Sequence, residues 1–461
     1  MQLSQIPNVT ASVDEPNLVG PAGLVPVMLL ARRAGLDTLA ARRVRIPGGA
    51  GFDAAAKVCS IVAGMITGAD SIDDMDVLRE GAVGKVLPGV KAPSTLGTFL
   101  RAFTFGHVRQ LGAVADGLLA GLARLVPALT GQNAHRDAGW WLDVDDTMRQ
   151  THGYAKQGVG YGYNKVKGLN ALLATCSTPD TAPVIVGQRL RRGGVNSARG
   201  AGKFIADAVA AARRAGATAT IRVRADSAYY NAQVVAAIRA GGAQFSVTAR
   251  MDPAVRKAIA AIDEDAWTSI QYPQAIWDED DRRWISDAQV AETTYTAFTS
   301  KAGGKVTARL IVRRVKRLNP AAPAGQQELF ATWRYHAVFT DTSEAMLTAE
   351  AHHRDHAIVE QVIADLKDSA LAHLPSGKFT ANAAWLACAV MAYNLSRAAG
   401  VLGGGKLPRA RTGTIRDRLI KIPARLSRTA RTYTLHLPAN TRHGARFLTM
   451  FTAAKDPPAA A

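Results

Sequence analysis

The chain has 461 residues, and its 56 Lys and Arg against 37 Asp and Glu give a formal net charge of +19 at pH 7 and a pI of about 10.1. Such an excess of positive charge indicates a polyanionic partner, most often nucleic acid. No apolar run approaches the roughly 18 residues of a membrane span, and no secretory signal stands out, so we expect a cytoplasmic protein of two or three domains and no membrane partner. The cysteines are too few and too scattered for a disulfide framework or a metal site (Cys59, Cys176 and Cys388).

The N-terminal region, residues 1–135, has the pattern of an all-α segment. Residues 1–20 lack periodicity and predict a loose arm, and the spacing of apolar residues then predicts helices at Leu24–Ala34, Phe52–Met65, Ser71–Leu78, Ser94–Phe105 and His107–Leu125. Ser94 follows a proline at the start of a periodic segment and is the predicted N-cap. The segments Asp70–Arg79 and Ser94–Phe105 fit a helix-turn-helix and, equally, an ordinary helical bundle.

The remaining regions predict an α/β core that carries a mainly β insertion. Residues 136–250 alternate strands and helices, after the strand that ends at Thr147: Lys165–Cys176, Pro183–Leu190, Ala201–Ala215 (helix), Ala219–Asp226, Asn231–Ala240 (helix) and Gln244–Thr248. Residues 251–342 predict the insertion, with strands at Trp267–Tyr272, Thr293–Thr299, Thr307–Val315 and Leu329–Phe339. Residues 343–402 return to the core with helices at Ala345–Asp368 and Ala381–Ala399.

The C-terminal region, residues 403–461, begins with the hinge Gly403–Gly405 and is strongly basic. From Lys406 to Arg431 it has nine Lys and Arg against one acid, Asp417. Both a solvated tail and an ordered, DNA-facing segment fit this pattern.

The first candidate catalytic residues lie in Gly139–Thr147, whose pattern predicts a short buried strand. Its alternation places Trp141, Asp143 and Asp145 on one face, and two carboxylates on an otherwise apolar strand are costly to bury unless a cation or donors meet them. The alternative is a strand end whose acids cap the next turn. A second acid, Asp226, ends the strand Ile221–Ala225, at the edge where α/β sheets carry function.

A third acid lies on the predicted helix Ala345–Asp368. At 100° per residue a polar stripe carries one carboxylate, Glu360, at its centre (His353, His356, Glu360, Ala364 and Lys367). The alternative is a solvated helix face. Two strand-borne Asp and one helix-borne Glu that meet would repel unless they hold hard divalent cations such as Mg²⁺, and two such ions can promote in-line displacement at a phosphodiester.

From Gly139 to Leu402 these blocks resemble the DDE transposases of bacterial insertion sequences, specifically the family named IS 1380, whose clan has a Tyr, Arg, Glu, Lys signature on the third-acid helix. The blocks that carry the resemblance are Leu142–Thr147, Gly153 with Gly158 and Tyr161–Lys167, Leu190–Gly194 with Asn196 and Ser197, Val223–Ser227, His353–Lys367, and Asn382 through Trp385 to Asn394-Leu395.

The resemblance implies an RNase H-like catalytic core and cut-and-paste transposition with two Mg²⁺ ions, Mn²⁺ being a possible substitute. It implies that Asp145, Asp226 and Glu360 are the catalytic, metal-binding acids, with Asp143 as the runner-up for the first. Its implied DNA contacts are Lys367, His353, His356, Arg191 and Arg192. The sequence departs from the signature at two of these, since His353 stands at the Tyr position and His356 at the Arg position.

The implied partners are double-stranded DNA, both the element's terminal inverted repeats and the target, and a second copy of the chain in a synaptic homodimer. We expect the bacterial cytoplasm, in association with the nucleoid. Two other hypotheses stay open: a catalytically impaired transposase that acts as a sequence-specific DNA-binding protein, and a different two-metal nuclease on the same fold.

Overall fold

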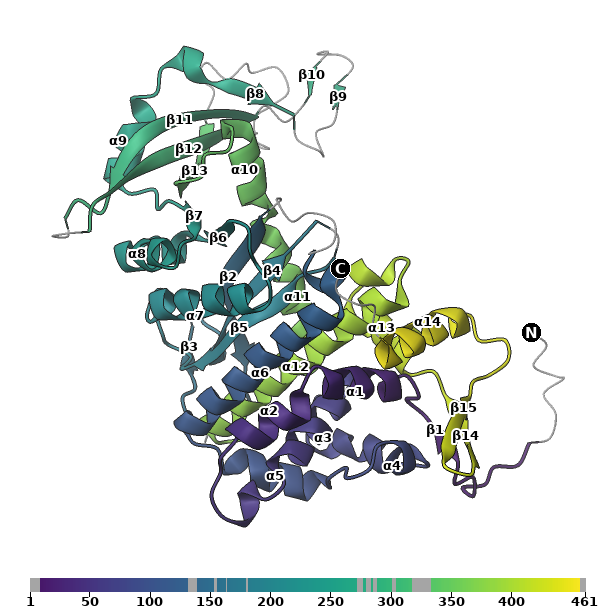
Figure 1. Cartoon of the computed structure of the whole chain (residues 1–461). Helices are drawn as coiled ribbons and strands as arrows, with labels where there is room; N and C mark the ends of the chain where they lie inside the picture. Colours follow the sequence, from purple (N-terminus) through teal and green to yellow (C-terminus); the bar gives the residue numbers. More distant parts are fainter. Residues whose placement is uncertain are drawn as a thin grey trace.

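The computed structural model describes residues 9–131, 139–152, 156–162, 164–179, 181–271, 277–278, 283–284, 288–300, 304–316 and 333–456. In Figure 1 a helical N-terminal part packs below a long mixed sheet, and the C-terminal part returns to the helical one. Nearly all of the buried apolar side chains belong to one continuous core that runs through these three parts.

The N-terminal part is helical, as its periodicity predicted. Its helices are α1 (Leu24–Arg33), α2 (Leu36–Arg43), α3 (Ala54–Thr67), α4 (Val83–Val86), α5 (Pro93–Arg101) and α6 (Phe105–Leu125). Helix α3 is apolar almost all round and is buried on most of its surface, which is typical of a central helix. Helix α6 begins with a capping box, in which the backbone N–H of Thr104 donates to the His107 ring.

Several details of this part differ from the sequence-based expectation. The N-cap of α5 is Ala92, and Pro93 takes the first helical position, because its fixed φ and missing N–H suit that place better than Ser94 does. Residues Asp73–Arg79 form a 3₁₀-helix, η3, so the first half of the predicted helix-turn-helix is not an α-helix. Within the predicted arm, the strand β1 (Leu18–Val19) pairs with a strand near the C-terminus.

The sheet is mixed, and its strand order is β3-β4-β2-β6-β7-β13-β12-β11-β8, with β5 also paired to β4. Strands β2, β4 and β5 are antiparallel, whereas β2, β6 and β7 run parallel through helical crossovers. The bounds of this half are β2 (Trp140–Gln150), β3 (Gly160–Tyr161), β4 (Lys167–Ser177), β5 (Val184–Arg191), α7 (Ala201–Arg214), β6 (Ile221–Ala225), α8 (Ala232–Ala240) and β7 (Gln244–Thr248).

The predicted insertion extends this sheet, because β13 pairs directly with β7. Its strands are β8 (Thr268–Ile270), β11 (Ala288–Ala297), β12 (Val306–Lys316) and β13 (Trp333–Thr340), beside the separate pair β9 (Trp277–Asp278) and β10 (Arg283–Trp284). The insertion also begins with a helix, α9 (Pro253–Ala260), whose N-cap Asp252 accepts a hydrogen bond from Val255 N–H. Sequence analysis missed α9, because eight residues give little periodicity.

The long helix predicted over 345–368 is interrupted. It comprises α10 (Met346–Arg354), a 3₁₀ turn at Asp355–Ala357, and α11 (Ile358–Lys367). Helix α12 (Phe379–Gly403) then passes between the sheet and the N-terminal helices (Figure 1). By length and composition α12 could span a membrane, which corrects the expectation about apolar runs, but 89% of its apolar window is buried inside the protein, as in the core helix of a soluble protein.

The C-terminal part is ordered rather than a solvated tail. It contains a 3₁₀ turn (Leu407–Arg409), α13 (Thr412–Ile415), a π-helical turn (Arg416–Ile420), the hairpin β14 (Ala424–Thr429) and β15 (Thr432–His436), and α14 (Gly444–Lys455). Strand β14 pairs with β1, and α14 packs against α1 and α12.

One side chain ties α12 to the edge of the sheet. Asn394, which is 2% exposed, donates to the carbonyl of Ile185 (2.8 Å) and accepts from its N–H (2.9 Å). We predict that Asn394→Ala lowers the free energy of unfolding by about 2–4 kcal/mol, because both backbone groups of Ile185 lose their partner in a dry environment. Urea unfolding measures the loss, with exposed Asn196→Ala as the control, and equal values for the two variants would contradict the prediction.

Candidate active site

Two of the predicted acids lie side by side at the ends of parallel strands. Strands β2 and β6 are paired in register as far as Val144 and Ala225. Asp145 and Asp226 are the next residues, and neighbouring strands lie about 4.8 Å apart. Asp226 also caps the turn that follows, since its carboxylate accepts from Ala228 N–H at 3.0 Å. The parallel register therefore places both carboxylates at one point of the sheet.

The environment of these acids disfavours their charged form. Burial raises the pKa of Asp145 to about 7, the negative charges of Asp226 and Asp146 add to the rise, and the hydrogen bond from Asp146 N–H and the nearby His356 oppose it. Burial likewise raises the pKa of Asp226, with Asp146 adding to it. Two carboxylates in this state are suited to a site in which a cation supplies the missing charge.

The helix that follows the sheet lies along the same strand. Helix α11 packs on β2, and the His356 ring is close enough to lower the pKa of both Asp145 and Asp226. Burial and Arg149 lower the pKa of Lys367, whereas the charge of Asp145 opposes them, so Lys367 also lies near that acid. His356 and Lys367 are about three turns apart on one stripe, and the exposed Glu360 stands between them.

The structure does not gather the three predicted acids into a closed cluster. Within the described residues, no group of three His, Cys, Asp or Glu side chains is close enough to hold a metal ion. Asp145 and Asp226 adjoin, whereas Glu360 faces solvent on the neighbouring helix. The structure therefore brings two of the three predicted acids together, and Glu360 lies outside that pair.

A family model described as "Transposase DDE domain group 1" matches residues 1–456, which is almost the whole chain. The chain belongs to the DDE transposase family. A search of curated proteins found no significant match. The match includes the helical and C-terminal parts as well as the sheet.

Asp143, the runner-up for the first acid, is fully engaged in this transposase. It is 0% exposed; its Oδ1 accepts from Arg224 Nε (2.7 Å) and from His356 Nδ1 (2.8 Å), and its Oδ2 accepts from Arg224 Nη2 (2.8 Å). Arg224 also donates to the carbonyl of His352. With its oxygens satisfied by protein donors, Asp143 has little capacity for an ion, which favours Asp145 as the first acid.

The predicted DNA contacts fall into two groups. His353 is 9% exposed, and its ring nitrogens are bonded to the hydroxyls of Ser246 and Thr248 at 2.9 Å each, while burial lowers its pKa to about 3. Arg191 is buried against Asp146 and Asn170. These two side chains support the site from within. By contrast, Arg192 is exposed and Lys367 is half-buried, and both stay predicted DNA contacts.

Sequence analysis missed the polar residues that hold the acids in place. Asp146 is buried on the opposite face of β2, where it accepts from Arg191, from Asn170 Nδ2 (3.0 Å) and from the Tyr229 hydroxyl (3.2 Å). Arg224 precedes Asp226 by two residues, so strand alternation alone places it on the face of Asp143. The spacing in the sequence could therefore have predicted Arg224 as a partner of Asp143. The partners of Asp146 could not be predicted in this way, because they come from three distant segments of the chain.

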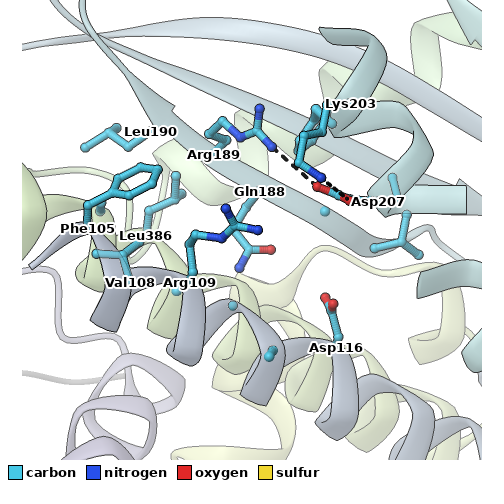
Figure 2. Close-up of a pocket in the computed structure, with 18 of the residues that line it drawn as sticks. Phe105, Val108, Arg109, Asp116, Gln188, Arg189, Leu190, Lys203, Asp207 and Leu386 are labelled. Carbon is cyan, nitrogen blue, oxygen red and sulfur yellow. Dashed lines mark hydrogen bonds and ion pairs between the residues drawn. The ribbon is translucent and has the colours of Figure 1, made fainter. Parts of the chain in front are cut away.

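Two hollows elsewhere lack this chemistry. A groove of about 490 Å³ lies between α6 and α7, where Arg189 (3.6 Å) and Lys203 (3.3 Å) are paired with Asp207 (Figure 2). In the same groove Arg214 is paired with Asp116 (3.0 Å), and Arg109 also lines it. A cleft of about 920 Å³ lies between α5, the end of β2 and the segment after α11, and it is lined by Arg101, Arg149 and Lys156. Neither hollow is lined by Asp145, Asp226 or Glu360.

We predict that Asp145→Asn stabilises the protein in a pH-dependent way. Because the folded-state pKa is raised, the wild-type carboxyl contributes stability that is full below pH 4 and is lost as the pH rises through 7. The amide cannot gain a negative charge as the pH rises, so the melting temperature of the variant should exceed that of wild type at pH 8.5 in chelator. The difference should shrink as the pH falls toward 4. Exposed Asp265→Asn is the control, and a pH-independent difference for Asp145→Asn would contradict the assignment.

Proposed function

We propose that the chain is an active DNA transposase that cuts the ends of a mobile element and joins them to target DNA. The observation that carries the proposal is the pair Asp145 and Asp226 at neighbouring strand ends, in a chain whose residues 1–456 match the family model. Glu360, the third acid of the proposal, lies on α11, which packs on β2. The RNase H-like character of the sheet and the specific relation to the family IS 1380 are part of the same proposal. So is the location in the bacterial cytoplasm.

The residues present fit a divalent cation. Asp145, Asp226 and Glu360 offer only carboxylate oxygens, the ligands that Mg²⁺ prefers and Mn²⁺ accepts. The raised pKa values of Asp145 and Asp226 mark a place where negative charge lacks compensation. Cations held by Asp145, Asp226 and Glu360 would activate the attacking water or 3′-hydroxyl and would stabilise the leaving oxygen of the phosphodiester.

The other residues of the site position these acids and the substrate. The buried pair Asp143–Arg224 fixes β2 against β6, and Asp143 also holds the His356 ring by its Nδ1–H. His356 therefore brings an imidazole beside the two acids, where the signature of the resembling family has the guanidinium of an Arg. Lys367 lies near Asp145, and in this proposal it contacts a phosphate next to the cut.

The test is cleavage of DNA that carries the ends of the element, with Mg²⁺ or with chelator. We predict that Asp145→Asn, Asp226→Asn and Glu360→Gln each lower the rate of cutting by about 10²-fold or more, because each removes a ligand of the reacting ions. Asp368→Asn, on the exposed end of the same helical segment, is the matched control and should cut like wild type.

Two outcomes would overturn the proposal. Cutting that survives Glu360→Gln would mean that the third acid is assigned wrongly. Binding to the ends without any metal-dependent cutting by wild type would favour the repressor hypothesis. That second hypothesis has two observations of its own: His353 is buried, and within the described residues Glu360 does not form a cluster with the other two acids.

A further inference from the structure

The hairpin β14–β15 is anchored at its base and exposed at its tip. Buried Leu419, Ile420 and Ile422 hold the chain just before it, and Ala424 and Leu426 continue that anchor. Backbone hydrogen bonds fix the same segment to the start of the chain, from Ala22 N–H to Ile422 (3.0 Å) and from Leu426 N–H to Asn17 (2.7 Å). In Figure 1 the hairpin projects from the helical part, on the side away from the sheet.

The projecting half of the hairpin is basic and polar. Between Lys406 and Arg446 the chain has eleven Lys and Arg against one acid. Arg425, Arg428 and Arg431 are exposed, and within the described parts of the chain none of them forms an ion pair with a carboxylate. Nearby, burial and the charges of Arg418, Arg442 and Arg446 lower the pKa of His443. This end of the molecule therefore has a high density of uncompensated positive charge.

The arrangement of side chains on the hairpin selects one class of polyanion. One face carries the cross-strand pairs Arg425–His436, Ser427–Thr434 and Thr429–Thr432, all of them polar. On the other face Arg428 lies over the ring of Tyr433, which is 44% exposed (5.6 Å). A lipid surface requires a contiguous apolar face, which this hairpin lacks. A two-stranded ribbon with hydrogen-bonding side chains instead matches the major groove of duplex DNA, which is about 12 Å wide.

We propose that the β14–β15 ribbon is a second duplex DNA-binding surface, separate from the catalytic acids, with Arg425, Arg428 and Arg431 as its phosphate and base contacts. The inference rests on the proposed function in that it takes DNA as the partner. It assigns the C-terminal ribbon a direct role in holding DNA while the acids on β2 and β6 cut elsewhere on the molecule.

The test is binding of a fluorescent DNA duplex, followed by anisotropy in chelator so that no cutting occurs. Arg428→Ala/Arg431→Ala should weaken binding by about tenfold or more, and the slope of log K against log salt should become shallower by about 1.8, since two phosphate contacts are lost. Arg256→Ala/Lys257→Ala removes the same charge from the exposed face of α9 and should change affinity less than twofold.

The outcomes separate the possible explanations. Equal effects of the two double variants would overturn the inference, because net charge alone would then account for the loss. Loss of binding to phosphatidylserine vesicles with duplex binding unchanged would overturn it in favour of a lipid surface. The melting temperature of each variant shows whether it is folded. If the alanine variant unfolds, the test is repeated with Arg428→Gln/Arg431→Gln, whose side chains are longer. A wild type that binds through the ribbon but never cuts would fail only the proposed function.

Discussion

The buried network around Asp143 is the interaction on which the site depends. It joins β2 through Asp143, β6 through Arg224, and the α10–α11 segment through the His352 carbonyl and the His356 ring. These three elements carry Asp145, Asp226 and Glu360 respectively. A buried ion pair adds little net stability compared with apolar packing, but removal of one partner costs about 3–5 kcal/mol. The network thus fixes the relative position of the acids more than it stabilises the fold.

Strand β2 contains three neighbouring carboxylates that differ in their partners. Asp143 and Asp146 are buried and satisfied by Arg224 and Arg191, whereas Asp145 has a backbone donor and a raised pKa. Four residues of sequence therefore contain two paired carboxylates and one, Asp145, whose burial is not offset by an arginine. Charge compensation explains the difference: Asp143 and Asp146 are paired with arginines inside the protein, whereas Asp145 is the carboxylate that we propose binds a cation from solvent.

Much of the fold was predictable because local patterns agree with the tertiary structure. The strands and helices between Lys167 and Thr248 follow alternation and 3.6-residue periodicity closely, and the parallel pairing of β2 with β6 follows from a crossover that contains α7. The break at Asp355–Ala357 was not predictable, since no proline or glycine marks it. The return of β14 to β1 joins residues about 400 positions apart, which no local pattern records.

For the site, sequence analysis expected Asp145, Asp226 and Glu360 to converge. The parallel register brings the first two together, whereas no cluster of three such side chains forms within the described residues. Sequence analysis also placed His353 on one helical stripe with His356, Glu360 and Lys367. It did not predict that His353 is buried. A periodic pattern cannot distinguish a side chain that faces solvent from one that forms hydrogen bonds with hydroxyls of another strand. Ser246 and Thr248 belong to β7, and only the sheet order brings them to His353.

The central claim is that Asp145, Asp226 and Glu360 form one cation site, and binding of Mn²⁺ followed by electron paramagnetic resonance tests it most directly. Wild type should bind Mn²⁺ more tightly at pH 8 than at pH 6, because the cation competes with the proton on Asp145 below its pKa of about 7. Asp226→Asn and Glu360→Gln should each weaken binding. Mn²⁺ binding that is independent of pH and unchanged in both variants would contradict the account.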